Sequence, residues 1–336
     1  MASEDRINYL NIGLMLLSAA LAFALPFELF LLAYAVLGPL HYLTEISWLH
    51  DRGYFLRREE SPWSKHILGG WLALVGFTLL VMIYGIYQER VAQDPVSPAF
   101  EIWLFYIVFA SAAALALRSH PAIATGVIVL TGTGAIFFSD TPWYGLIAFL
   151  IITIVHLLVF TGAFMLQGAL RARSLSGIVS IGVFAACIAS FFLVALPGHP
   201  ASAFIRETYA PFEALNAQLI RAFGLGQARS FAEVYESSAG AAVMRLIAFA
   251  YTYHYLNWFT KTSVIGWHRI SKGRGAVILL LWAGALAAYA YSYVLGFVLL
   301  YSLSVLHVML ELPLNSQSFA GIGRELRGLA GRPKPV

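Results

Sequence analysis

The chain has 336 residues, of which 60% are hydrophobic and only 11% are charged. Soluble domains carry roughly 45–50% apolar and about 25% charged residues, so this composition excludes an ordinary soluble enzyme. The single cysteine, Cys187, excludes an internal disulfide. The apolar residues come in repeated blocks of about 20, each long enough to cross a bilayer as a helix. The sequence therefore predicts an all-α, polytopic integral membrane protein.

Ten segments are expected to span the membrane. Prolines mark several of their boundaries, as expected near helix starts and stops. In chain order the segments are 7–25, 27–48, 67–88, 99–117, 121–139, 142–167, 175–196, 241–263, 275–294 and 296–315.

The basic residues indicate how the spans are oriented. Ten spans place both termini on one side of the membrane. The opposite side then keeps five of the 21 Lys and Arg residues, which leaves sixteen on the side of the termini; the five are Arg90, Arg206, Arg221, Arg229 and Arg245. The positive-inside rule makes the richer face cytoplasmic. We therefore expect both termini in the cytoplasm and the chain in the cytoplasmic membrane of a bacterium.

One long connection interrupts this pattern, residues 197–240 on the outer side. It contains apolar and polar residues at helical spacing. This spacing predicts a pair of interfacial helices resting on the membrane surface, and a cap over a substrate entrance is the alternative. With no other soluble segment evident, residues 1–336 are expected to form a single transmembrane domain.

Four of the nine histidines fall inside predicted spans. His41, His156, His254 and His307 lie one each in the second, sixth, eighth and tenth spans, which all run inward from the outer side and place them at similar depths. Ionisable residues within spans are costly and usually face a protein interior. Neutral imidazole is the commonest metal ligand, and helical bundles build metal sites from inward side chains. We predict one metal site, with hydrogen-bonded packing histidines as the alternative.

The other five histidines lie in loops or near the ends of spans, where interfacial or exposed positions are expected. They are His50, His66, His120, His199 and His268.

Two glutamates accompany these histidines at a helical spacing. Glu45 follows His41 by four residues, and Glu311 follows His307 by four. Residues four apart share one face of a helix. Since a metal-bound imidazole usually donates its other ring N–H to a carboxylate, carbonyl or water, both glutamates are candidate partners of the histidines or direct ligands.

The stretch around His254 is aromatic. Tyr251 and Asn257 flank His254 at minus three and plus three, so they share its helical face and could hydrogen-bond in a cavity. Ordinary packing is the alternative for the aromatic residues.

The four histidine stretches, taken in order, resemble the motifs of the bacteriorhodopsin-related membrane proteins of the Brp/Blh type, which include bacterial β-carotene dioxygenases. The stretches are "GPLHYLTE", "TIVHLLVF", "YTYHYLNW" and "VLHVMLE". The resemblance implies that the four histidines bind one ferrous iron, which with dioxygen cleaves a polyene into aldehydes.

The sequence departs from the family pattern at three positions. Tyr42 stands where the family has glycine, Glu45 where it has aspartate, and Trp258 where a second histidine can stand. A relative with another lipophilic substrate therefore fits as well.

These observations predict a membrane-embedded non-haem iron oxygenase. Its cofactor would be Fe(II), and its partners would be dioxygen, a lipophilic small molecule from the bilayer, such as a carotenoid or another polyene, and membrane lipids; no nucleic acid is expected. Three alternatives remain: a transporter or proton pathway that uses intramembrane His and Glu residues, a di-iron desaturase or hydroxylase, and a haem protein.

Overall fold

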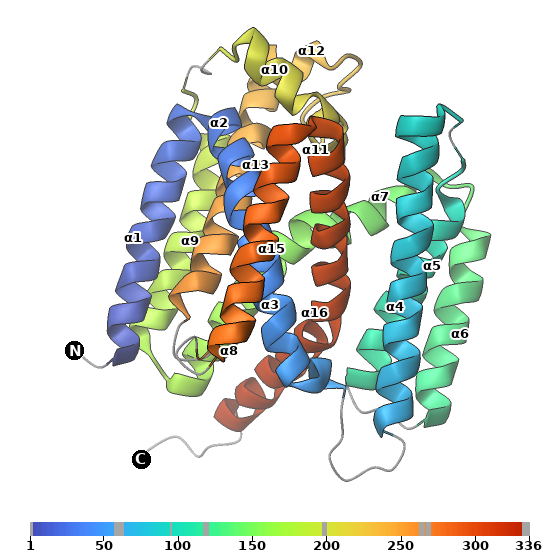
Figure 1. Cartoon of the computed structure of the whole chain (residues 1–336). Coiled ribbons are helices and arrows are strands. Elements are labelled where there is room, and N and C mark those ends of the chain that lie inside the picture. The colour runs from blue at the N-terminus through green and yellow to red at the C-terminus, as the bar shows by residue number, and fades with distance from the viewer. Residues whose placement is uncertain are drawn as a thin grey trace. The chain divides into compact units, whose positions relative to one another are not determined.

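The structure is a computed structural model that describes residues 3–56, 64–94, 96–116, 121–196, 200–261, 266 and 270–330. Helices account for most of these residues, and none of them is in a strand (Figure 1). The all-α prediction is confirmed. The chain divides into two compact units, one made of Met1–Gly38 with Gly168–Arg269 and the other of Pro39–Gln167 with Ile270–Val336.

In the described part of the chain, eight helices are long and apolar enough to cross a membrane. They coincide with eight of the ten predicted spans, and the membrane character of the chain is thus supported by the structure as well as by composition. Their bounds are Asp5–Ala24, Pro26–Asp51, Lys65–Tyr87, Ala99–Ala116, Pro142–Ala172, Leu175–Leu193, Lys272–Tyr291 and Tyr293–Gly328.

The other two predicted spans are also helices, but each differs from the eight. Segment 121–139 forms α6 (Pro121–Phe137), an apolar helix shorter than the rest. Segment 241–263 forms α13 (Ser238–Thr260), which carries the polar residues Arg245, His254 and Asn257, all buried. A helix covered by other helices need not be apolar on every face, which explains why α13 falls below the hydropathy of the eight.

The first unit is built around α13. Its neighbours in the contact pattern are α1, α2, η1 and α9, so α13 is covered by apolar helices over most of its length (Figure 1). Ser237 caps the start of α13, because its hydroxyl accepts a hydrogen bond from the Gly240 N–H at 2.9 Å. The bounds of the neighbours are α1 Ser3–Ala24, α2 Pro26–Leu32, η1 Ala33–Leu37 and α9 Leu175–Leu193.

The described residues of the long connection form short helices packed on α2 and α13. Tyr209 and Asn216 are fully buried there, and the Tyr209 hydroxyl donates to the Asn216 side-chain oxygen. Tyr209 also packs on Phe27 and Phe30 of α2, and Asn216 contacts Met244 of α13, so the segment shares a core with these two helices. Its elements are α10 Ala203–Tyr209, η5 Ala210–Phe212, α11 Glu213–Ala222 and α12 Ala232–Glu236.

The second unit is organised by α16 (Tyr293–Ala330), which packs against α4, α5, α15, η2 and η4. This helix continues well past the predicted span, and Pro313 lies inside it. The other elements are α3 Gly38–Asp51, η2 Gly53–Phe55, α4 Ser64–Tyr87, η3 Gln88–Ala92, α5 Ala99–Ala116, α7 Pro142–Leu150, η4 Ile151–Phe160, α8 Thr161–Ala172 and α15 Lys272–Tyr291.

The long helical stretch Pro142–Ala172 changes its winding in the middle. Residues Ile151–Phe160 form the π-helix η4, between α7 and α8. π-Helical turns are rare and are frequently found at functional sites. This one carries His156.

Candidate metal centre

Three of the four predicted ligands gather in the second unit. His41 comes from α3, His156 from η4 and His307 from α16, and each is at most 2% exposed. The His307 ring lies 5.3 Å from the ring of His41 and 5.0 Å from the ring of His156, centroid to centroid. His307 is therefore the common neighbour of the other two imidazoles.

The closest approach is between two ring nitrogens. Nε2 of His307 and Nε2 of His156 are 3.2 Å apart. Two nitrogens that are each about 2.1 Å from one metal ion are roughly 3.0 to 3.4 Å apart for octahedral and tetrahedral angles. The separation fits two ligands of one ion, and it also fits a hydrogen bond from one imidazole to the other.

Two of these imidazoles each lie beside a buried carboxylate. Glu45 Oε2 lies 3.1 Å from His41 Nε2, one turn along α3, and Glu311 Oε2 lies 3.1 Å from His156 Nδ1. Glu45 therefore contacts the histidine of its own helix, whereas Glu311 contacts His156 on another helix.

The Glu311 carboxylate lies beside Nδ1 of His156. A neutral ring that carries its proton on Nδ1, facing this carboxylate, keeps the lone pair of Nε2. That lone pair points at His307 Nε2. If Nε2 of His307 also carries a lone pair, the two lone pairs repel each other unless a cation lies between them. The two histidines would then be placed as two ligands of one ion.

The charge of the site favours a cation. Glu45 and Glu311 are the only Lys, Arg, Asp or Glu residues that are buried in the described part of the second unit. Two ionised carboxylates in an apolar interior are expensive without compensating positive charge. A divalent ion would supply two positive charges, so both the donor atoms and the net charge fit a metal.

Tyr42 is a site residue that sequence reasoning missed. It is fully buried, and its ring stacks on His307 at 4.2 Å with an interplanar angle of 24°. This contact holds the plane of the imidazole. In the sequence, Tyr42 differs from the family motif, which has glycine at this position. Its place directly after His41 is the one signal that it belongs to the site.

Asn315 is a second residue that the sequence pattern did not single out. It follows Glu311 by four residues on α16 and is 2% exposed. Among the described residues, neither polar atom of its side chain has a hydrogen-bond partner. A buried amide without partners costs free energy.

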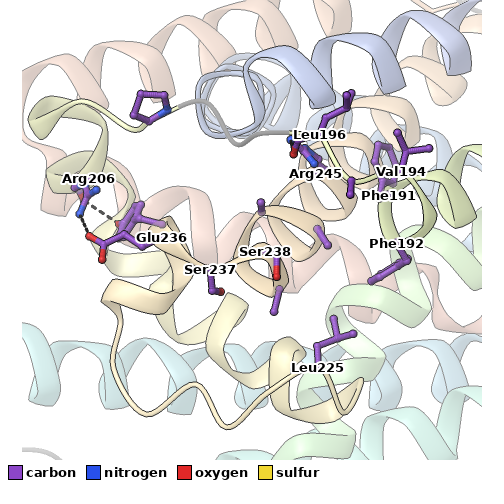
Figure 2. A pocket seen from close by; sticks show the side chains of 16 residues that line it. Phe191, Phe192, Val194, Leu196, Arg206, Leu225, Glu236, Ser237, Ser238 and Arg245 are labelled. Atoms are coloured by element: carbon purple, nitrogen blue, oxygen red, sulfur yellow. Dashed lines mark hydrogen bonds and ion pairs between the residues drawn. The ribbon is translucent and has the colours of Figure 1, made fainter.

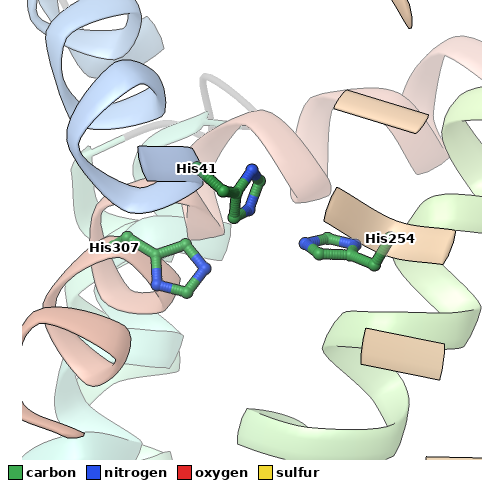
Figure 3. A group of neighbouring side chains, drawn as sticks. All are labelled: His41, His254 and His307. Atoms are coloured by element: carbon green, nitrogen blue, oxygen red, sulfur yellow. The ribbon is translucent and has the colours of Figure 1, made fainter. Parts of the chain in front are cut away.

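The fourth predicted ligand belongs to the first unit. His254 lies on α13 and is 8% exposed. Figure 3 draws it together with His41 and His307, the two buried imidazoles of the second unit that could hold a metal ion. Within the second unit, the ring nitrogens that His41 and His307 offer lie within 4.8 Å of each other.

The other two predicted site residues also lie on α13. Tyr251 packs edge-on against Phe30 at 5.0 Å and against Tyr34 at 6.0 Å. Asn257 is buried, and its backbone carbonyl accepts a hydrogen bond from the hydroxyl of Thr260. The contacts of Tyr251 are those of an aromatic packing residue, which is the alternative considered for it.

The remaining histidines divide into two groups. His50 and His66 are exposed, as expected for the ends of spans. His120, His199 and His268 lie outside the described residues.

Comparisons with known proteins found no family model, no curated protein and no solved structure that matches the chain. The function of the chain is therefore inferred from its own residues and from the geometry of the histidine cluster.

Proposed function

We propose that the protein is a membrane-embedded non-haem iron oxygenase that acts with dioxygen on a lipophilic substrate, such as a carotenoid or another polyene. The observation that carries the proposal is the 3.2 Å approach of His156 Nε2 and His307 Nε2, with Glu311 beside His156 and Glu45 beside the neighbouring His41. His41, His156 and His307 would hold the ion, and His254 would complete the set. Ferrous iron bound by imidazoles, with open coordination positions, supplies the binding and activation of dioxygen.

The residues of the chain have separate tasks in this proposal. Glu311 lies beside Nδ1 of His156 and Glu45 beside Nε2 of His41, so each negative charge favours the proton on that nitrogen and would leave the other ring nitrogen for the metal. Tyr42 fixes the ring plane of His307. Burial excludes bulk water from all of them, which strengthens these electrostatic contacts.

The surroundings of the site favour an apolar substrate. The three imidazoles lie on helical stretches that are long and apolar enough to cross a membrane. A substrate dissolved in the bilayer can approach such helices, whereas a charged metabolite would first have to lose its hydration. The substrate class follows from this placement, and its identity is left to experiment.

The experiment is oxygen uptake by detergent-solubilised, iron-loaded protein supplied with β-carotene and other polyenes, with aldehyde products identified by mass spectrometry. We expect uptake with at least one polyene, loss of uptake in His307→Ala, and normal uptake in His50→Ala, whose histidine is exposed at the end of the same α3 helix as His41. Iron-loaded protein that consumes no oxygen with any lipophilic compound would contradict the proposal.

One contact pattern favours a second candidate function, a proton pathway. Glu311, His156 and His307 form a continuous chain of contacts of 3.1 and 3.2 Å through both nitrogens of His156. Such chains move protons in membrane transporters. Proton flux into liposomes that persists after iron removal and stops in His156→Ala would favour this function over the oxygenase.

A further inference from the structure

Helix α16 continues well beyond the membrane span predicted for it, which ends at residue 315. The helix ends at Ala330, so residues 316–330 form an extension about 22 Å long at a rise of 1.5 Å per residue. We call these residues the α16 extension (Figure 1). They follow His307 and Glu311 on the same helix, and the proposed oxygenase gives them no role. The positive-inside rule places this end of the span on the cytoplasmic side.

The start of the α16 extension packs against a membrane-length helical stretch of the second unit. The Phe319 ring lies edge-on to Phe160 of η4, with the ring centroids 5.9 Å apart. Gly321 lies against the side chain of Gln167 of α8, where a larger side chain would not fit. Phe160 and Gln167 belong to the stretch Pro142–Ala172, which is long and apolar enough to cross a membrane. Because the predicted span of this stretch ends at residue 167, the extension starts near the membrane surface.

The α16 extension has an exposed apolar side. Phe319 and Leu326 are 46% and 50% exposed. They stand seven residues apart, about two helical turns, so they share one face. Helices that carry apolar residues on one face and arginines beside it lie in the membrane interface with the apolar face toward the acyl chains. The apolar side therefore fits lipid better than water.

A basic side lies next to the apolar one. Arg324 and Arg327 are both exposed and stand three residues apart, which makes them neighbours on the helix surface. Arg327 Nη2 lies over Gly323, directly before Arg324. Among the described residues, no hydrogen bond or ion pair holds either guanidinium group. Glu325 lies about 100° and 160° around the helix from the two arginines, so its carboxylate points away from them.

We propose that the α16 extension lies on the membrane surface and binds the headgroup of an anionic phospholipid. Arg324 and Arg327 pair with the headgroup phosphate, and Phe319 and Leu326 contact the upper part of the acyl chains. Arginine donates two parallel hydrogen bonds to a phosphate, and the anionic lipids of the cytoplasmic leaflet attract basic segments next to a span. The site is separate from the proposed oxygenase function and does not depend on it.

The test is native mass spectrometry of the full-length protein in uncharged detergent with dioleoyl phosphatidylglycerol or dioleoyl phosphatidylcholine. The two lipids have the same acyl chains, but only the first has a net charge. Phosphatidylglycerol should bind about tenfold or more tightly, and the difference should shrink as the salt concentration rises, because the headgroup and both arginines are exposed to solvent. Equal binding of the two lipids would overturn the proposal, and so would inorganic phosphate that displaces phosphatidylglycerol at equal concentration.

Substitutions on the helix assign the binding to the α16 extension. Arg324→Gln and Arg327→Gln should each weaken phosphatidylglycerol binding about fivefold and leave phosphatidylcholine binding unchanged. Leu326→Gln should weaken the binding of both lipids. Arg229→Gln is the matched control for charge, because Arg229 is also exposed but lies in the long connection of the first unit; an equal loss in this variant would overturn the assignment.

A second control concerns a cavity of about 600 Å³ in the first unit, at the end of α9 and the start of α13 (Figure 2). Phe191, Phe192 and Leu225 line it, so an acyl chain could also enter there. Ala242→Leu places a larger side chain in this cavity and should leave phosphatidylglycerol binding unchanged. Loss of binding in Ala242→Leu would place the lipid in the cavity and overturn the proposal.

A gain of binding completes the test, because a misfolded variant cannot produce one. Glu325→Gln removes the negative charge of the α16 extension and should strengthen phosphatidylglycerol binding. Binding that is unchanged both in Glu325→Gln and in the double variant Arg324→Gln, Arg327→Gln would overturn the proposal. A dimer mass that disappears in Leu326→Gln would also overturn it, because the apolar side would then be covered by a second copy of the chain.

Discussion

Replacing Glu311 with glutamine tests the role of the carboxylate beside the metal ligands. Glu311 Oε2 lies 3.1 Å from His156 Nδ1, and both side chains are at most 3% exposed. The amide is nearly the same size as the carboxylate but carries no charge. It keeps a polar oxygen of the same size beside His156 Nδ1, so the fold should be kept while the negative charge beside the ligand is lost.

The loss of such a carboxylate partner typically costs 10- to 100-fold in metal affinity, or about 1.4 to 2.7 kcal/mol of binding free energy. Competition of iron against a calibrated chelator, with detergent-purified protein under anaerobic conditions, measures this. Glu101→Gln is the matched control, since Glu101 is a glutamate of α5 that lies beside Gly85 of α4. Wild-type affinity in Glu311→Gln, or an equal loss in Glu101→Gln, would refute the reasoning.

Three further predictions concern stability. Tyr42→Phe should lower the melting temperature much less than Tyr42→Ala, because the phenylalanine ring still stacks on His307, whereas Tyr42→Ala should lose about 3–5 kcal/mol of unfolding free energy; equal melting temperatures of the two variants would contradict this. Asn315→Leu should raise the melting temperature of metal-free protein, because a buried amide without partners is replaced by an apolar group, and a lower value would contradict it. Arg274→Met should cost less than about 1 kcal/mol in a denaturation curve, because its ion pair with Asp51 at 2.6 Å is partly exposed, and a larger cost would show that the pair is coupled to the packing of α3 and α15.

The sequence predicts the helices well, because each membrane span is a run of about 20 apolar residues. All ten predicted segments fall on helices of the structure. The least apolar of them, α13, is still predicted, since Arg245 and His254 are separated by the mainly apolar stretch 246–253. The division of the chain into two compact units has no signal in the sequence, and the prediction of a single domain stays a prediction.

The sequence predicts the candidate site only in part, because helical spacing relates residues on the same helix. The spacing of four places Glu45 beside His41, where the structure has it. The same spacing could not show that Glu311 contacts His156, since this contact joins two helices. The π-helical winding around His156 and the stacking of Tyr42 on His307 likewise depend on how helices pack. The assignment of iron and of an oxygenase activity stays a proposal.

The most direct measurement is the iron content of protein purified in detergent, compared with His41→Ala, His156→Ala, His254→Ala and His307→Ala, and with His50→Ala as the control. The account predicts close to one iron per chain in the wild type and in His50→Ala, and a loss of iron in each of the other four variants. Metal-free wild-type protein that takes up no ferrous iron, or iron that is retained in His156→Ala and His307→Ala, would contradict it.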